Sequence, residues 1–271
     1  MPSYIANARM YSVTPEAEEA WKTLLGHIFE EARLSFDYMP YPAPQPMEVL
    51  WERPDLGCVF MCGYPIALKL ADVVPIAAPI PAAAWAGGKA LYRSDLIVRD
   101  DSRFQTLEDT FGGRIGWTVH HSHSGFNALR YHLLAYRTPE RPALYREVHG
   151  DLITARGILD AVLAGEIDVG PLDGYWHDLI RYHRPELTQG VRVIASTALA
   201  PLPAFVAVPG LPANQVARMK IAFANAEDRP WFPPLGETLR LTGFATVEQD
   251  DFAVTLERDR EAKAQGYAMI A

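Results

Sequence analysis

The chain is predicted to be an α/β protein whose sheets are largely parallel. Runs typical of β-strands alternate with runs of helical periodicity along the sequence, which is the pattern of βαβ units. With 271 residues, 49% of them hydrophobic, the chain can bury a sizeable core in one large domain or in two lobes. The net charge of −8 argues against a nucleic-acid surface, and no apolar run is long enough to predict a membrane-spanning helix.

The first part of the chain begins with a strand and an amphipathic helix. Residues 3–10 have strand character, and Thr14 and Pro15 then begin a helix as its N-cap and first residue. The predicted buried face of this helix has a spacing of three and four: Ala17, Ala20, Trp21, Leu24, Leu25, Ile28, Phe29 and Ala32. The elements expected next are a strand at 35–39, a proline-rich loop at 40–46, a helix at 47–53, a buried strand at 57–62, a helix at 65–71, a strand at 73–80 and a stretch of small residues at 81–88.

The second part continues the alternation. The elements expected are a longer strand at 89–99, a short helix and turn at 100–113, a strand at 114–119, a helix at 124–137, a strand at 145–148, a helix capped by Asp151 that ends at Ala164 before Gly165, a strand at 167–172 and a helix at 174–183. Strands at 191–196 and 204–208 follow, and the remainder is expected to be mostly helical, at 212–226, 234–241 and 250–265.

The two cysteines, Cys58 and Cys62, both fall in the buried strand at 57–62. Four residues of strand separate their Cα atoms by about 13 Å, which is more than a disulfide spans. We therefore expect both to be reduced core residues.

The most informative segment is the turn that contains Ser122, Ser124 and Gly125, between the strand at 114–119 and the helix at 124–137. Two hydroxyls at a helix N-terminus, with free backbone N–H groups and the positive end of the helix dipole, favour an anion. The glycine lets a ligand approach the backbone closely. The alternative is that Ser122 or Ser124 only caps the helix.

Ligands of α/β sheets lie at the carboxyl ends of strands, and this rule selects the loops at 63–65, 120–125 and 173–175. In order, these loops and their flanks resemble a known family. The segments that carry the resemblance are Cys-Gly-Tyr-Pro at 62–65, Leu-Tyr-Arg-Ser at 91–94, Ser-His-Ser-Gly-Phe-Asn at 122–127 and Ala-Val-Leu-Ala-Gly-Glu-Ile-Asp-Val at 161–169. Over about residues 50–208 the chain resembles the substrate-binding proteins of phosphate, phosphite and phosphonate ABC transporters, and especially their short relatives.

The resemblance implies a type II periplasmic-binding-protein fold, with lobes at 1–90 plus 200–271 and at 91–199 and a ligand cleft between them. It implies binding of a small oxyanion of the phosphonate or phosphate class, with no cofactor and no catalysis, by a transport component that partners an ABC permease or by a ligand sensor. The ligand-binding residues it implies are Tyr64, Tyr92, Ser122, His123, Ser124, Gly125, Thr154 and Asp173. It also implies a periplasmic location, whereas Met1-Pro2-Ser3 lacks the features of a signal peptide, which leaves a cytoplasmic location open.

The chain departs from the family at residues 153–155. Relatives commonly carry Gly-Ser-His there, whereas this chain has Ile153, Thr154 and Ala155, so the hydroxyl is kept and the histidine is lost. His149 and His123 are the candidates to replace it. A carboxylate at Asp173 repels a dianion, so we expect a mono-protonated ligand, or one with a positive or apolar tail that reaches Tyr64 and Trp176. The alternative is that Asp173 only caps the helix at 174–183.

The same fold could instead carry an enzyme or a metalloprotein that acts on a small metabolite. His120, His121 and His123 are close in sequence, but on a strand and turn their side chains point in different directions, and we expect no metal there. Ser122 and Ser124 lack the Gly-x-Ser-x-Gly pattern of a nucleophile elbow, so we expect no hydrolase.

Overall fold

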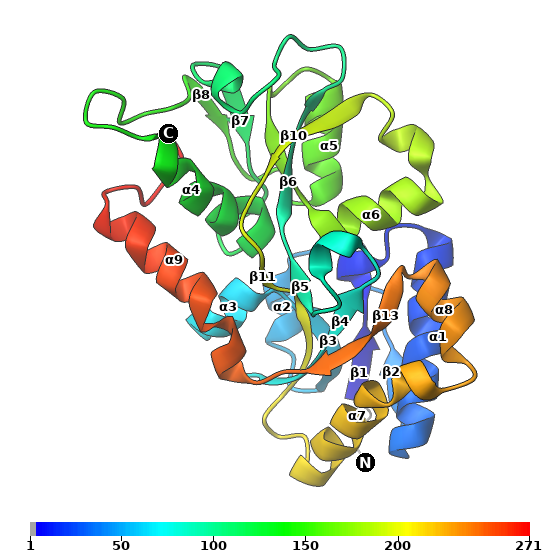
Figure 1. Cartoon of the computed structure of the whole chain (residues 1–271). Coiled ribbons are helices and arrows are strands. Elements are labelled where there is room, and N and C mark those ends of the chain that lie inside the picture. Colours follow the sequence, from blue (N-terminus) through cyan, green and yellow to red (C-terminus); the bar gives the residue numbers. More distant parts are fainter. Residues whose placement is uncertain (1–3) are drawn as a thin grey trace. The chain divides into compact units, whose positions relative to one another are not determined.

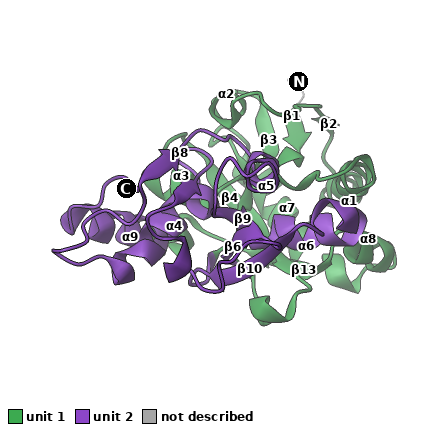
Figure 2. Ribbon diagram, turned by 90° about the horizontal axis from the view of Figure 1, so that it is seen from above, with its two compact units in different colours: residues 1–91, 201–253 green, residues 92–200, 254–271 purple. Residues whose placement is uncertain are grey.

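The computed structural model describes residues 4–271 and divides them into two compact units, coloured separately in Figure 2. Unit 1 comprises the chain up to Leu91 together with Pro201–Ala253, and unit 2 comprises Tyr92–Ala200 together with Val254–Ala271. The C-terminal segment therefore belongs to unit 2, although the sequence analysis placed it in the first lobe. Within the described part of the chain, no helix has both the length and the apolar character needed to cross a membrane.

Unit 1 contains a six-stranded sheet with the order β13-β4-β12-β3-β1-β2. Its strands are β1 (Tyr4–Asn7), β2 (Phe36–Tyr38), β3 (Leu56–Met61), β4 (Val74–Pro81), β12 (Ala204–Ala207) and β13 (Leu241–Thr246). Its helices are α1 (Pro15–Ala32), α2 (Met47–Trp51), α3 (Gly63–Leu68), α7 (Ala213–Ala224) and α8 (Phe232–Thr238). Helix α1 packs against both α7 and α8, and α2 packs against β3 (Figure 1). Ser3, the first residue of the predicted strand at 3–10, lies outside the described residues.

The sheets are mixed, but the prediction that they are mainly parallel is wrong. β1 runs parallel to β2 and β3, whereas β12 pairs antiparallel with β3 and β4, and β13 pairs antiparallel with β4. The reason is that β12 and β13 return from the C-terminal part of the chain and lie on either side of β4. Strand β13 was not predicted, because Gly243 and two exposed positions interrupt its apolar pattern.

Strand β3 is buried on both faces, as its continuous apolar sequence predicts. Val59 and Met61 belong to one hydrophobic cluster with Trp51 of α2. Phe60 lies in an aromatic group on α1 and β12, with ring centroids 5.2 Å from Trp21 and 3.8 Å from Phe205.

Helix α1 has the predicted start and face. The hydroxyl of Thr14 accepts a hydrogen bond from the Ala17 N–H at 3.2 Å, and all eight residues of the predicted apolar face are buried. Cys58 and Cys62 are buried free thiols, as expected, and burial raises the pKa of Cys58 well above its ordinary value.

Unit 2 contains a three-stranded antiparallel sheet with the order β10-β6-β9 and a parallel pair, β7 and β8. Its strands are β6 (Ser94–Arg99), β7 (Arg114–Gly116), β8 (Glu147–His149), β9 (Gly170–Asp173) and β10 (Val191–Ser196). Its helices are α4 (Ala128–Leu133), α5 (Ala155–Leu163), α6 (Gly174–His183) and α9 (Ala253–Ala264), the last of which starts at the unit boundary. The short strands β5 (Leu91–Tyr92) and β11 (Ala200–Pro201), where the chain passes between the units, form a two-stranded sheet.

Two local expectations for unit 2 are corrected. The strand expected at 89–99 is broken at Arg93 into β5 and β6. Helix α5 is capped by Thr154, whose hydroxyl accepts from the Gly157 N–H at 3.0 Å, and not by Asp151, which has a left-handed φ of 56°. Asp151 lies three residues before Thr154, so it belongs to the loop that precedes α5 and cannot cap the helix.

Candidate functional site

The Ser122–Gly125 turn follows the carboxyl end of β7 and begins a π-helical segment, His123–Asn127, which continues into α4. Ser122 is the N-cap: its hydroxyl accepts from the Gly125 N–H at 2.9 Å, and its carbonyl accepts from the Asn127 N–H at 3.0 Å. The N–H of Ser124 therefore precedes the first intrahelical hydrogen bond, as anion-binding N–H groups do. π-helical turns within α-helices are frequent at functional sites.

Ser124 and Asp173 lie together, although 49 residues separate them in sequence. The Ser124 hydroxyl donates to Asp173 Oδ2 over 3.4 Å. The other carboxylate oxygen, Oδ1, caps α6 by accepting from the N–H groups of Tyr175 and Trp176 at 3.0 Å each. Asp173 is therefore the helix cap that the alternative interpretation expected, and one of its oxygens also faces the serine turn.

Ser94, at the start of β6, is hydrogen-bonded to the turn. Its hydroxyl donates to the Ser124 carbonyl at 2.8 Å, and its N–H donates to the Thr197 hydroxyl at 2.9 Å. Ser94 also lies opposite Asp173 in the β6–β9 pairing. The central strand of the sheet thus holds Ser124 and Asp173 in one place.

Packing alone is enough to require glycine at position 125. A Cβ on Gly125 would lie 1.9 Å from Thr118 Oγ1, and the Thr118 N–H donates to the Gly125 carbonyl at 3.2 Å. Thr118 therefore occupies the side of Gly125 on which a side chain would lie, and the approach of a ligand to the backbone stays a prediction.

His123 and Tyr92 are both buried, with ring centroids 6.0 Å apart. Burial, together with the positive charge of Arg258, lowers the pKa of His123 from 6.5 to about 3. The imidazole is therefore neutral at neutral pH, and the turn presents no cationic side chain of its own.

The tautomer of His123 follows from its neighbours. Arg130 can only donate, and its Nη2 is 2.8 Å from Asn127 Oδ1. Asn127 Nδ2 consequently faces the Thr255 carbonyl at 2.7 Å and His123 Nδ1 at 3.3 Å. Since Nδ2 is a donor, Nδ1 of His123 is the acceptor, and the proton of the neutral ring is on Nε2.

Two further predicted site residues have structural contacts away from the turn. Thr154 caps α5, and its loop is tied to the site by the Ile153 N–H, which donates to the Thr118 carbonyl at 3.3 Å. Tyr64 lies in α3 of unit 1 and is buried there. Its contribution to ligand binding stays a prediction.

Beside Asp173, the start of α6 is attached to β6 by a buried polar group that the sequence analysis missed. Asp95 Oδ2 lies 3.0 Å from His177 Nδ1, and Oδ1 accepts from Ser196 at 2.8 Å and from Arg93 at 3.0 Å. Burial opposes ionisation, but the hydrogen bonds from His177 and Ser196 hold the pKa of Asp95 below its ordinary value. An ionised Asp95 therefore anchors the helix whose cap is Asp173.

The three neighbouring histidines do not form a metal site. Across residues 4–271 there is no group of three His, Cys, Asp or Glu side chains placed to hold a metal ion. The ring of His120 instead packs on Trp117, with centroids 4.3 Å apart, and on Phe126 at 5.0 Å.

Comparison with known proteins identifies the family. Residues 12–252 match the family of ABC transporter, phosphonate, periplasmic substrate-binding proteins. The chain therefore belongs to this family of transport-associated binding proteins, which confirms the resemblance found in the sequence. A search of curated proteins finds no match.

Solved structures of binding proteins have the same fold. A binding protein component of an ABC phosphonate transporter from Pseudomonas aeruginosa is 16% identical, with a TM-score of 0.79 over 98% of this chain and 88% of the other. PhnD1 from Prochlorococcus marinus, in complex with methylphosphonate, is 13% identical, with a TM-score of 0.78 over 96% and 98%. The alkanesulfonate-binding protein SsuA from Xanthomonas axonopodis pv. citri, bound to MOPS, is 16% identical, with a TM-score of 0.60 over 98% and 94%. At these identities the likeness shows the fold, and it confirms the two-lobed α/β class.

The Gly125→Ala variant is expected to lose about 1–3 kcal/mol of unfolding free energy, the usual result of overpacking a core, because the new methyl group meets Thr118. Urea unfolding measures this loss. The control is Gly26→Ala in α1, where a Cβ meets no atom within 4 Å, and which should be neutral or stabilising by up to about 1 kcal/mol. Equal stability of the two variants would refute the packing role of Gly125.

Protonation of His123 should destabilise the fold in mild acid. The pKa of this group is about 3 in the folded protein and about 6.5 when unfolded, so its contribution to stability is complete above pH 6.5 and is lost as the pH falls towards 3. At pH 5 the loss is about 2 kcal/mol. In urea unfolding at pH 7 and pH 5, His123→Gln should remove this part of the pH dependence, whereas His120→Gln, at an exposed position, should keep it. The same pH dependence in the wild type and in His123→Gln would contradict the assignment.

Proposed function

We propose that this protein binds a small oxyanion of the phosphonate or phosphate class at the Ser122–Gly125 turn of unit 2. It does so as the substrate-binding component of an ABC transporter or as a ligand sensor. The observation that carries the proposal is the joint presence, at one helix start, of the Ser124 hydroxyl and N–H, the Ser122 hydroxyl and the carboxylate of Asp173. Family membership supports the same class of ligand, as does the methylphosphonate bound by PhnD1.

The donors of this turn are neutral. Ser122 accepts from the Gly125 N–H through its oxygen, so its own hydroxyl proton can be donated to a ligand. The N–H of Ser124 lies at the positive end of the helix dipole. Neutral donors of this kind bind an oxyanion by hydrogen bonds and give it geometric selectivity.

Asp173 adds a preference for a ligand that keeps one proton. A dianion beside this carboxylate is repelled, whereas a mono-protonated oxyanion can donate its proton to Oδ2, which now accepts from Ser124. The ligand we propose is therefore a singly charged oxyanion, either a phosphonate that keeps one proton or dihydrogen phosphate.

We infer that the site binds its ligand without converting it. A serine nucleophile needs a base to take its proton, and Ser124 donates to Asp173, which is a much weaker base than histidine. His123 directs Nδ1 towards Asn127. In the transport role, the partner that receives the ligand is an ABC permease.

The Ser124→Ala variant should bind methylphosphonate at least tenfold more weakly, since a hydrogen bond to a charged group contributes about 1.5–3 kcal/mol. Isothermal titration calorimetry measures this, in a panel of methylphosphonate, phosphate, phosphite and sulfate. The control is Thr14→Ala, which removes the cap of α1 in unit 1 at a cost of about 1 kcal/mol in stability and should leave the affinity unchanged. Unaltered affinity in Ser124→Ala, or no binding of any anion of the panel by the wild type, would reject the proposal.

The affinity of the wild type for methylphosphonate should fall as the pH rises through the last ionisation of the ligand. Asp173→Asn should flatten this dependence, because an amide can donate to the dianion, and asparagine caps a helix about as well as aspartate does. Titrations at several pH values test this. Asp160→Asn, at an exposed position of α5, provides a control with the same change of charge. If Asp173→Asn keeps the pH dependence of the wild type, Asp173 does not face the ligand.

A further inference from the structure

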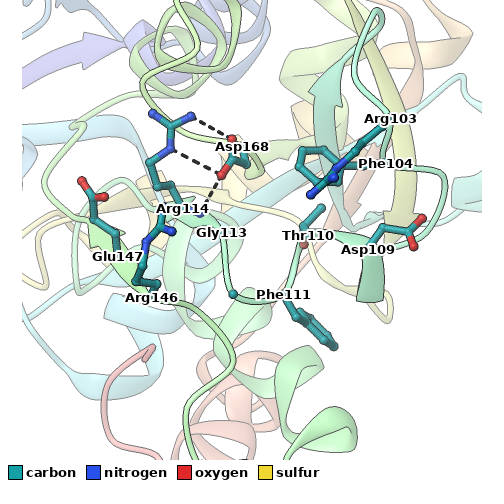
Figure 3. A pocket seen from close by; sticks show the side chains of 11 residues that line it. Arg103, Phe104, Asp109, Thr110, Phe111, Gly113, Arg114, Arg146, Glu147 and Asp168 are labelled. Atoms are coloured by element: carbon teal, nitrogen blue, oxygen red, sulfur yellow. Dashed lines mark hydrogen bonds and ion pairs between the residues drawn. The ribbon is translucent and has the colours of Figure 1, made fainter.

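A second group of charged side chains lies at the other end of the β7–β8 pair. Arg114 and Glu147, the first residues of β7 and β8, lie opposite each other in the register of the pair. The Ser122–Gly125 turn, in contrast, comes after the carboxyl end of β7. The amino ends border a pocket of about 500 Å³, with six charged residues in its lining: Arg103, Asp109, Arg114, Arg146, Glu147 and Asp168. Figure 3 shows this pocket.

The three carboxylates of the pocket are all committed to other groups of the protein. Asp168 binds Arg114, with 2.9 Å between Oδ1 and Nη2, and also accepts from the Arg114 N–H at 2.8 Å. Asp109 accepts from the N–H groups of residues 105 and 106 at 2.8 and 2.9 Å. Glu147 lies 2.6 Å from Nε2 of His149. The oxygens of all three carboxylates are therefore directed at donors of the protein, and of the three only Asp168 has its charge paired with an arginine.

Two of the three arginines are not committed in this way. Within residues 4–271, neither Arg103 nor Arg146 has an ion pair or a side-chain hydrogen bond, and the guanidinium of Arg103 lies 5.8 Å from the ring centroid of Phe104. Figure 3 shows Arg103 on one side of the pocket and Arg146 on the other, on the same side as Arg114. The formal charges of the lining cancel, so what the pocket offers a ligand is the open hydrogen-bond donors of these two guanidinium groups.

We propose that this pocket is a second anion-binding site of unit 2, for a small polyanion with at least two oxyanion groups, one for Arg103 and one for Arg146. A guanidinium group binds a phosphate or a carboxylate through two parallel hydrogen bonds. Arginines on two sides of a pocket suit two separated groups of one ligand better than a single monoanion. The volume of about 500 Å³ lies in the usual range for small-molecule sites.

The chemistry of this pocket differs from that of the serine turn. The turn offers neutral donors beside a carboxylate, whereas the pocket offers permanent positive charges on two exposed side chains. Binding in the pocket should therefore weaken steeply with salt. Methylphosphonate, with one oxyanion group, should not compete for it.

Calorimetric titration of the full chain with pyrophosphate, tripolyphosphate and citrate, at low and high salt, tests the proposal. We expect one polyanion to bind with one-to-one stoichiometry, and the double variant Arg103→Ala/Arg146→Ala to weaken this binding at least tenfold. The fold should survive, because both side chains are exposed, and thermal unfolding checks this. Binding of pyrophosphate or tripolyphosphate identifies a phosphate ligand, and binding of citrate alone identifies a carboxylate ligand.

The matched control is Arg156→Ala/Arg184→Ala, which removes two exposed arginines of unit 2 that pair with Asp160 and Glu186. It makes the same change of charge and should leave polyanion binding unchanged. Equal weakening in both double variants would show non-specific attraction and overturn the proposal, as would no binding of any of the three polyanions. Methylphosphonate titrated into the same variants tests the serine turn separately, so a failure of one site is distinguishable from a failure of the other.

Discussion

The buried ion pair between Arg130 and Asp259 is the interaction on which the geometry of the serine turn depends. The two residues are 129 positions apart, both are buried, and Arg130 also donates to the Ala268 carbonyl at 2.7 Å. Removal of Asp259 would leave the buried charge of Arg130 uncompensated, at a cost of about 3–5 kcal/mol, whereas Asp259 has a second cationic partner in Lys263. The pair joins α4 to α9, which lie side by side in Figure 1, and brings the end of the chain into unit 2. Arg130 also donates to Asn127 Oδ1, which turns Asn127 Nδ2 towards His123 Nδ1 and so determines the tautomer of His123.

Features that depend on neighbours in sequence could be predicted. The face and cap of α1 and the limits of α6 follow from residue spacing and from Thr14 and Asp173. Features that depend on distant segments could not. The strand β13 and the antiparallel pairing of β12 require contacts between the two ends of the chain, and periodicity in one window holds no information on them. The prediction that α9 belongs to the first lobe was wrong for the same reason, because its sequence has almost no apolar face that could indicate the unit against which it packs.

The same distinction between local and distant contacts applies to the candidate site. Strand ends indicated the turn at Ser122–Gly125 and Asp173, and the structure brings Ser124 to Asp173. The side chains that orient the turn were missed, because Ser94 and Asn127 sit in ordinary strand and helix sequence and only their contacts reveal their part. Gly125 was predicted from the approach of a ligand to the backbone, and the structure adds a packing reason, since Thr118 occupies the space where a side chain would lie.

The two anion sites proposed for unit 2 rest on opposite solutions to one electrostatic problem, which is how a protein of net charge −8 holds a negative ligand. At the serine turn the charge of the ligand is limited. Backbone N–H groups and hydroxyls are fixed in place, the buried imidazole of His123 is neutral, and Asp173 disfavours a second negative charge. At the amino ends of β7 and β8, arginines and carboxylates lie together in equal number instead. Each carboxylate is bound by a neighbour, and two guanidinium groups remain available to a ligand.

Fixed neutral donors discriminate between ligands by geometry and protonation, and salt has little effect on them. Exposed arginines discriminate by the total charge of the ligand, and salt screens this attraction. One short strand, β7, thus separates the site proposed for a small ligand of low charge from the pocket proposed for a polyanion.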